Sequence, residues 1–385
     1  MNVIQKGIVA LVCSAVTGKK MTLPEAFTLT DAENLIVKHQ IVGLAYEGAV
    51  QCGIPASDPT MRRLFQRYCQ ITFRSNGQMQ AVAKMMAVFE ENGIDYLPVK
   101  GYLMKQLYPK PEMRVMTDAD VLVRMAQYDR IRPLMESLGY TEGIVDDHAL
   151  VWDGKEIEIE LHRRLVPSDE ETYSYIGDGW SRAVCRQGHR YDLQAEDHYI
   201  YLFAHLVKHY RRGGIGLRQV VDLWVFARKH PELDQTYLKE QLRQQHLETF
   251  HDNILKLLAF WFEDAAADEK TEFISQFIFD SGSWGTTEQR IIFEGYKHAK
   301  HAKSAKAGHK RMVIWILFPN ALEMSDRYPV LRKAPWLLPV FWPIRWVTAV
   351  LFRRKNVRAV RRKAEFITEE RVDSFAQALE YVGLS

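Results

Sequence analysis

The sequence is poor in the features that mark several classes of protein. Its 385 residues contain four cysteines, with no CxxC pair and no zinc-ribbon spacing: Cys13, Cys52, Cys69 and Cys185. Unpaired cysteines at scattered positions are typical of a reducing compartment, and they indicate a cytoplasmic protein. Neither sign of charge dominates, because 51 basic residues stand against 48 acidic ones and the net charge is +3. Any nucleic-acid or membrane partner would therefore have to meet a local patch of charge.

Long uninterrupted apolar runs are also scarce. Residues 8–16 are apolar apart from Ser14, and amphipathic sequence follows, so we predict a first helix instead of an export signal. Residues 334–352 are apolar and aromatic, but three prolines and Arg345 argue against a membrane span. Basic residues follow as far as Lys363. The segment therefore has two interpretations, packing against a helical core, which we favour, and peripheral contact with an anionic membrane surface.

The remaining patterns predict three parts and an α+β fold. Residues 1–89 are expected to form an N-terminal helical segment, with one helix over 31–49 and a long one over 61–89. Residues 90–166 alternate between strand and helix and end in a hairpin, which predicts a small mixed sheet with helices. Residues 190–385 return to helical spacing and form a larger C-terminal helical domain.

Acidic side chains gather on two of the expected strands. Asp118 and Asp120 are two residues apart, so both project from one face of their strand, about 7 Å apart. In EIEIELH, acidic residues alternate with apolar ones, and either Glu160 or Glu158 would complete a trio with the aspartates. Such a trio suits two Mg²⁺ ions about 4 Å apart. The structural alternative is a chance Asp-x-Asp beside an ordinary solvated strand face.

Groups that bind phosphate precede these acids. Lys100 and Gly101 close a buried strand and open a helix, where backbone N–H groups favour an anion and glycine permits close approach. Arg114 lies four residues before Asp118 and offers a planar cation for triphosphate oxygens. Metal ligands, a phosphate cradle and a cation for developing charge are the parts that phosphoryl or nucleotidyl transfer requires.

The order of these motifs resembles the nucleotidyltransferases of the DNA polymerase β superfamily, and within it the uncharacterised bacterial nucleotidyltransferase family. Three phrases carry the resemblance: KGxxL…LYPxPxxRxxxDxD over Lys100 to Asp120, ELHRRL over Glu160 to Leu165, and HLVKH over His205 to His209. The resemblance implies a polymerase β-like core that moves a nucleoside monophosphate from an NTP, such as ATP, to an acceptor with release of pyrophosphate.

The resemblance also implies roles for individual residues. Asp118 and Asp120 would bind Mg²⁺, Glu160 would be the third acid, and Gly101 would lie under the nucleotide phosphates. The acceptor would be a small molecule, a protein or an RNA.

The helical part holds a second group of polar residues. His205 and His209 are spaced i, i+4, as are Arg218 and Asp222. A histidine pair with this spacing can bind zinc, but no third ligand accompanies it in the sequence, so we do not expect a zinc site. One alternative is a structural pair between His205 and Asp222. The other, encouraged by the resemblance, is that Lys208 or Arg218 contacts the nucleotide from across the cleft.

Two other functions remain open at the level of sequence. One is a toxin-like nucleotidyltransferase that acts on tRNA or protein, for which the lysine stripe within 297–311 would contact the acceptor. The other is a catalytically degenerate nucleotide-binding scaffold held at a membrane surface by residues 334–363.

Overall fold

The chain folds into two compact units in a computed structural model that describes residues 1–145, 149–167, 172–283, 285–300, 314, 318–321, 324, 328, 330–352 and 368–384. One unit comprises residues 1–209 and 215–284, and the other comprises 210–214 and 285–385. The three-part division expected from the sequence stays a prediction. Most of the lysine stripe, from 301 to 311, and the basic residues 353–363 lie outside the described residues.

Four helices open the first unit: α1 (Val3–Thr17), α2 (Leu29–Lys38), α3 (Val42–Cys52) and α4 (Pro59–Glu91). The long α4 begins at Asp58, whose carboxylate accepts the N–H groups of Thr60 and Met61. The prediction of one helix over 31–49 is wrong. The helix is interrupted between α2 and α3, where Gln40 adopts a φ of 56°.

A seven-stranded sheet forms the centre of this unit, in the order β3-β4-β5-β2-β1-β7-β6. The strands are β1 (Tyr96–Pro98), β2 (Asp118–Val123), β3 (Thr141–Val145), β4 (Ala149–Asp153), β5 (Glu158–His162), β6 (Ala183–Gln187) and β7 (Arg190–Leu193). The pairs β2–β5 and β1–β7 are parallel, and the other neighbours are antiparallel. The predicted α+β class with a mixed sheet is confirmed.

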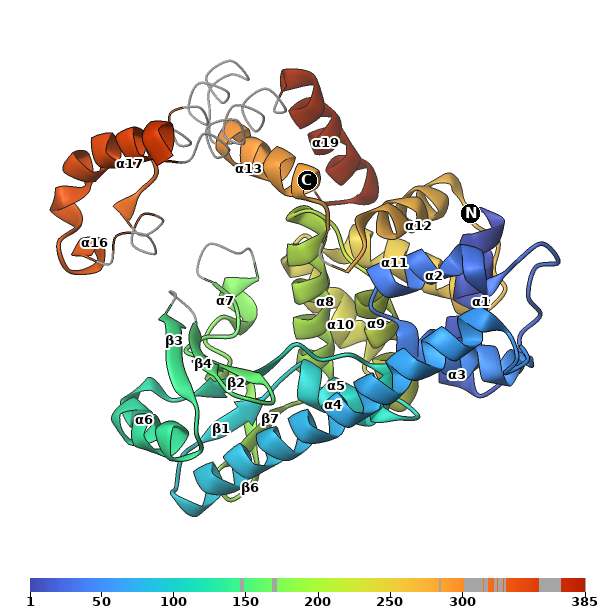
Figure 1. The fold of residues 1–385 in the computed structure, drawn as a ribbon, viewed down its shortest axis with the longest axis horizontal. Helices are drawn as coiled ribbons and strands as arrows, with labels where there is room; N and C mark the ends of the chain where they lie inside the picture. The colour runs from blue at the N-terminus through green and yellow to red at the C-terminus, as the bar shows by residue number, and fades with distance from the viewer. Residues whose placement is uncertain are drawn as a thin grey trace. The chain divides into compact units, whose positions relative to one another are not determined.

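One face of the sheet is apolar and covered by helices. Val121 on β2, Trp152 on β4 and Ile159 on β5 belong to a buried core that they share with Phe89 of α4 and Met135 of α6 (Tyr128–Ser137). Figure 1 shows the length of α4, which carries several side chains of this core. Because side chains alternate along a strand, the acidic residues of β2 and β5 are left on the opposite face.

Strands β6 and β7, which extend the sheet at one edge, were not predicted from the sequence. Four of the five residues of β6 are exposed, and those of β7 are half-buried. Such strands lack the alternation of buried and exposed side chains by which a strand is recognised in a sequence. Their place depends instead on pairing between β7 and β1.

The other helices complete both units. The first unit also contains α5 (Gly101–Leu107), α7 (Tyr173–Ile176), α9 (Leu217–Lys229), α10 (Gln235–Gln244), α11 (Glu248–Phe262) and α12 (Glu269–Ser281). Helix α8 (Ala195–Arg211) belongs to it as far as His209. The second unit contains α13 (Thr287–Lys300), α16 (Val330–Lys333), α17 (Leu338–Phe352) and α19 (Glu369–Val382).

Helix α17 contains much of the apolar segment that the sequence left with two interpretations. Its Trp342 donates a hydrogen bond to the Pro319 carbonyl, whereas Val340, Ile344 and Val347 are exposed. Within the described ranges, no helix combines the length and the apolar character needed to cross a membrane. Contact with a membrane surface stays a prediction.

Candidate active site

The parallel pairing of β2 and β5 places acidic residues side by side on the sheet face opposite the apolar core. Asp118 lies opposite Glu158, and Asp120 lies opposite Glu160. The polar face of the EIEIELH segment therefore adjoins the Asp-x-Asp strand. The chain supplies this arrangement because both strands alternate acidic and apolar residues in the same phase.

A cavity of about 260 Å³ lies between this sheet face and helices α8 and α9. All the residues proposed for the site from the sequence line it, namely Lys100, Gly101, Arg114, Asp118, Asp120, Glu160 and Lys208. Its wall also includes His162, His205, His209 and Arg218. The cavity thus joins segments that are about 100 residues apart in the sequence.

Lys100 lines the cavity and forms an ion pair with Asp120. Its Nζ is 2.8 Å from Asp120 Oδ1 and 5.6 Å from the centre of the Tyr201 ring. Burial alone would lower the pKa of Lys100, but the negative charge of Asp120 outweighs burial and raises it. The backbone at Lys100 has a φ of 46°, a strained conformation for a residue with a side chain.

Asp120 is held in its charged form by two neighbours. Burial would raise the pKa of its carboxyl, but Lys100 and a hydrogen bond from His162 lower that pKa well below the usual range. His162 Nε2 lies 2.9 Å from Asp120 Oδ1 and 3.3 Å from Glu160 Oε2. Burial opposes charge on His162, yet these two carboxylates raise its pKa above the ordinary value.

Asp118 has a different environment from Asp120. Burial, together with the negative charge of Asp120, raises the pKa of the Asp118 carboxyl. The Thr117 hydroxyl donates to Asp118 Oδ1 at 3.0 Å. A site in which one carboxyl is disfavoured as an anion would gain stability from an added cation.

Gly101 packs closely against the start of β2. A Cβ atom at this position would lie 3.0 Å from Met116 Cγ and 3.3 Å from the Asp118 carbonyl oxygen. The glycine therefore allows α5 to begin against the strand that carries the aspartates. This packing is a structural reason for glycine here, in addition to its predicted place under the phosphates.

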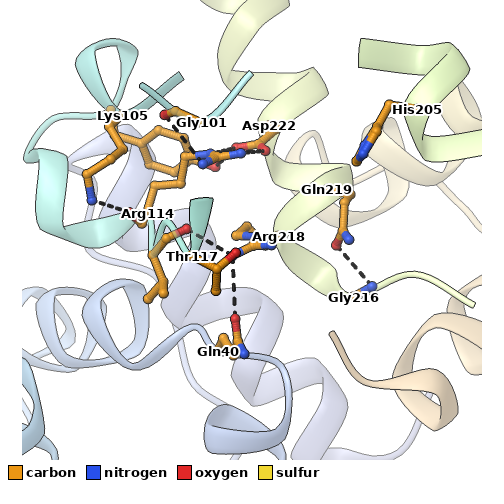
Figure 2. Close-up of polar contacts among 12 residues, drawn as sticks. Gln40, Gly101, Lys105, Arg114, Thr117, His205, Gly216, Arg218, Gln219 and Asp222 are labelled. Atoms are coloured by element: carbon orange, nitrogen blue, oxygen red, sulfur yellow. Dashed lines mark hydrogen bonds and ion pairs between the residues drawn. The ribbon is translucent and has the colours of Figure 1, made fainter. Parts of the chain in front are cut away.

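Arg114 is engaged by Asp222 of α9, as Figure 2 shows. Its Nε and Nη2 atoms donate to both Asp222 oxygens at 2.9 to 3.1 Å, and Tyr108 donates to Oδ1 at 2.7 Å. The remaining Nη1 lies 3.4 Å from the Gly101 carbonyl oxygen. The suggested pair between His205 and Asp222 is wrong, because Asp222 receives its hydrogen bonds from Arg114 and Tyr108.

Two neighbouring cations, Arg218 in the cavity wall and Lys105, donate hydrogen bonds to backbone oxygens. Arg218 donates to the Val115 carbonyl at 2.9 Å and lies 3.4 Å from the Gln40 side-chain oxygen (Figure 2). Lys105 is fully buried and donates to the Arg114 carbonyl. Burial, together with the charge of Arg114, lowers the pKa of Lys105 to about 7. These contacts fix the Arg114–Asp118 segment from both sides.

The two histidines of α8 contact each other. His205 Nε2 and His209 Nε2 are 3.0 Å apart, which makes one a donor and the other an acceptor. Burial and the nearby charge of Lys100 lower the pKa of His205 well below its ordinary value. In the described part of the chain, neither histidine belongs to a group of three potential metal ligands.

One such group does occur at the sheet, and it includes a residue that the sequence analysis did not assign. Ligand atoms of Asp120, Glu160 and His162 all lie within 4.8 Å of one another. Asp118 stands on the same strand face but is not part of this group. The sequence signal for His162 was present, because the alternation of β5 places it on the face of Glu160.

Comparison with known proteins now identifies the family. Residues 27–263, more than half of the chain, match the family model described as uncharacterised nucleotidyltransferase. The chain belongs to this family. The predicted family is confirmed, and the protein is an enzyme of nucleotidyl transfer with an NTP and an acceptor as substrates.

Other comparisons add little to this assignment. No curated protein matches the chain. A solved structure, the solution structure of the antibiotic-resistance factor ANT(2'')-Ia, is similar over 46% of this chain and 97% of that chain, with 10% identity and a TM-score of 0.35. At that TM-score the likeness supports no conclusion about this nucleotidyltransferase.

Proposed function

We propose that this nucleotidyltransferase is Mg²⁺-dependent and that its reaction occurs in the cavity between β2, β5, α8 and α9. The observation that carries the proposal is the shared position of Asp118, Asp120 and Glu160 on one cavity wall, with Lys100 and Lys208 on the same cavity. Carboxylate oxygens are the ligands that Mg²⁺ prefers in proteins. The cations suit the phosphates of an NTP.

The acids present at the site fit a divalent ion. Asp118 and Asp120 project from alternate positions of one strand, and Glu160 lies beside Asp120 on the next. Burial, and after it the negative charge of Asp120, raises the pKa of the Asp118 carboxyl despite the nearby Lys100, so a bound cation would stabilise its charged form. Bound Mg²⁺ would neutralise phosphate charge and lower the pKa of the attacking oxygen.

The chain's own residues would orient the substrates. Asp118 and Asp120 would hold the metal, and Glu160 would help to activate the acceptor oxygen by accepting its proton, so that this oxygen attacks the α-phosphorus as pyrophosphate leaves. Lys100 and Lys208 bind the phosphates, and Gly101 lets them approach the backbone. Because Arg114 Nε and Nη2 already bind Asp222 and Nη1 lies near the Gly101 carbonyl oxygen, we assign Arg114 to positioning Gly101 and α9 in place of contacting phosphate.

Between the two glutamates that the sequence offered as third acid, the cavity favours Glu160. Glu160 lines the cavity and belongs to the group of close ligand atoms, whereas Glu158 lies one pair further along, opposite Asp118. The two residues have the same chemistry on the same strand. They therefore form a matched pair for mutation.

The proposal is tested by nucleotide binding, measured calorimetrically for each NTP with and without Mg²⁺. We expect Mg²⁺-dependent binding by the natural protein, with a loss of about a hundredfold or more in affinity in the Asp118→Asn/Asp120→Asn double variant, because metal and phosphate bind together. Glu160→Gln should lower pyrophosphate release strongly, and Glu158→Gln should not.

Two results would contradict the proposal. One is NTP binding of equal strength in the natural protein and the double variant. The other is an absence of binding by both proteins with and without Mg²⁺, which would favour the scaffold interpretation. Circular dichroism of each variant establishes that a loss of binding does not come from unfolding.

A further inference from the structure

A nitrogen ligand stands beside the two carboxylates of β2 and β5. His162 is 1% exposed and Asp120 is 5% exposed, so both are fixed in the wall of the cavity, whereas the Glu160 side chain reaches further into it. His162 Nε2 is the atom that points to both acids, at 2.9 Å from Asp120 Oδ1 and 3.3 Å from Glu160 Oε2.

Two of the three separations are close to those of adjacent ligands around one ion, and all three ligand atoms lie within 4.8 Å of one another. In an octahedral site with bonds of about 2.1 Å, adjacent ligand atoms are about 3 Å apart, since the edge is √2 times the bond length. The imidazole nitrogen and the two carboxylate oxygens thus need little rearrangement to share a divalent ion. The three donors come from adjacent, paired strands, which makes their spacing a property of the sheet register.

We propose that His162 is a direct ligand of the catalytic metal, and that the Asp120–Glu160–His162 set binds first-row transition ions such as Mn²⁺ more tightly than Mg²⁺, which stays the ion of the proposed reaction. The inference rests on the proposed function for the use of a metal at this cavity. Imidazole raises affinity for transition ions, whereas Mg²⁺ favours a shell made only of oxygen. Mn²⁺ is the probe of choice because its unpaired electrons report the atoms bound to it.

Lys100 would compete with a bound metal ion for Asp120 Oδ1. Its ammonium group is 2.8 Å from the same Asp120 oxygen that faces His162. A metal ion bound at this oxygen would repel the ammonium group of Lys100, which would weaken the Lys100–Asp120 pair and leave Lys100 Nζ available to the NTP phosphates. Removal of the ammonium group should therefore raise metal affinity, opposite to the effect of removing a ligand.

The test uses full-length protein with Mn²⁺ alone, without nucleotide. Pulsed electron paramagnetic resonance should show ¹⁴N coupling in the natural protein, replaced by ¹⁵N coupling when histidine is ¹⁵N-labelled. In His162→Asn the coupling should disappear, and Mn²⁺ affinity should fall about tenfold or more while Mg²⁺ affinity, measured by competition, falls less. His209→Asn, on the same cavity, should keep the coupling, and Lys100→Met should bind Mn²⁺ more tightly.

Several outcomes overturn the inference. Bound Mn²⁺ without histidine coupling in the natural protein would mean that His162 only donates a hydrogen bond to Asp120. Coupling that survives in His162→Asn would place the nitrogen elsewhere. An absence of Mn²⁺ binding would also refute it. The labelled natural protein gives an answer even if His162→Asn fails to fold. These results are separable from failure of the proposed function, which is judged by NTP binding and pyrophosphate release.

Discussion

At the scale of single residues, the buried pair of Arg114 and Asp222 holds two distant parts of the chain together. Arg114 precedes β2, and Asp222 lies on α9, 108 residues later. Both side chains are less than a tenth exposed, and the carboxylate accepts from Tyr108 as well as from Nε and Nη2 of the guanidinium. Breaking such a pair leaves a charge without compensation in the interior.

We expect Arg114→Ala to lower the free energy of unfolding by about 3–5 kcal/mol, because Asp222 would remain buried without its cation. Arg114→Lys should recover only part of this, since an ammonium group cannot bind both oxygens in the same planar geometry. Urea unfolding followed by tryptophan fluorescence measures the change. Arg63→Ala is the control: Arg63 contacts Glu33 through Nε and Nη2 as well, but is largely exposed, and its loss should matter far less. Equal losses in the two alanine variants would refute the assignment.

At the scale of elements, sequence patterns predicted those helices and strands whose position depends on neighbouring residues in the chain. Strand β2, helix α6 and the β4–β5 hairpin follow from alternation, helical spacing and turn residues. The break between α2 and α3 does not, because no glycine or proline marks it. It is fixed by tertiary contacts of His39, which bonds to the Phe279 carbonyl and accepts from the Leu217 N–H.

Some features of the candidate site could likewise be predicted from local sequence patterns, whereas others depend on contacts between distant parts of the chain. The alternation of acids predicted that Asp118 and Asp120 share a face and that a glutamate of the next polar strand joins them. The register that sets Asp120 opposite Glu160 comes from pairing across about 40 residues, which no local pattern encodes. The engagement of Arg114 by Asp222 was missed for a similar reason, since the partner lies on a helix far along the chain.

Helices α1 and α3 offer a test of how closely two elements approach. Gly48 of α3 lies against the backbone of α1, where an added Cβ would be 1.9 Å from the Leu11 carbonyl oxygen. Gly48→Ala should therefore push the helices apart and cost about 1–3 kcal/mol or more, although alanine is the better helix former. Thermal unfolding measures the loss. Val50→Ala on the exposed side of α3 should change stability by less than about 0.5 kcal/mol, and a similar effect of both substitutions would contradict the close packing.

At the scale of the whole molecule, buried histidines connect stability to pH. His39, His198 and His251 all lie in the first unit and are less than a tenth exposed. Burial lowers the pKa of each to about 4. For His39, the Leu217 N–H donates to Nδ1 at 3.3 Å, an interaction that requires an unprotonated nitrogen. The folded protein thus keeps these imidazoles neutral.

This difference predicts acid sensitivity in a defined window. The unfolded chain binds protons at a histidine pKa of about 6.5, whereas the folded chain does so only near pH 4, so the unfolded state holds more protons in between. This contribution to the free energy of unfolding should therefore be complete above about pH 6.5 and be lost as the pH drops towards 4, by on the order of 3 kcal/mol for each histidine.

Urea midpoints measured from pH 7.5 to 4 should show this slope, and His39→Gln should make it shallower even if it lowers stability at pH 7. His246→Asn, at an exposed position with a positive φ, should leave the slope unchanged, because its imidazole is in solvent in both states. A midpoint that stays constant between pH 6.5 and 4.5 would mean that water or a local opening admits protons to these sites at little cost.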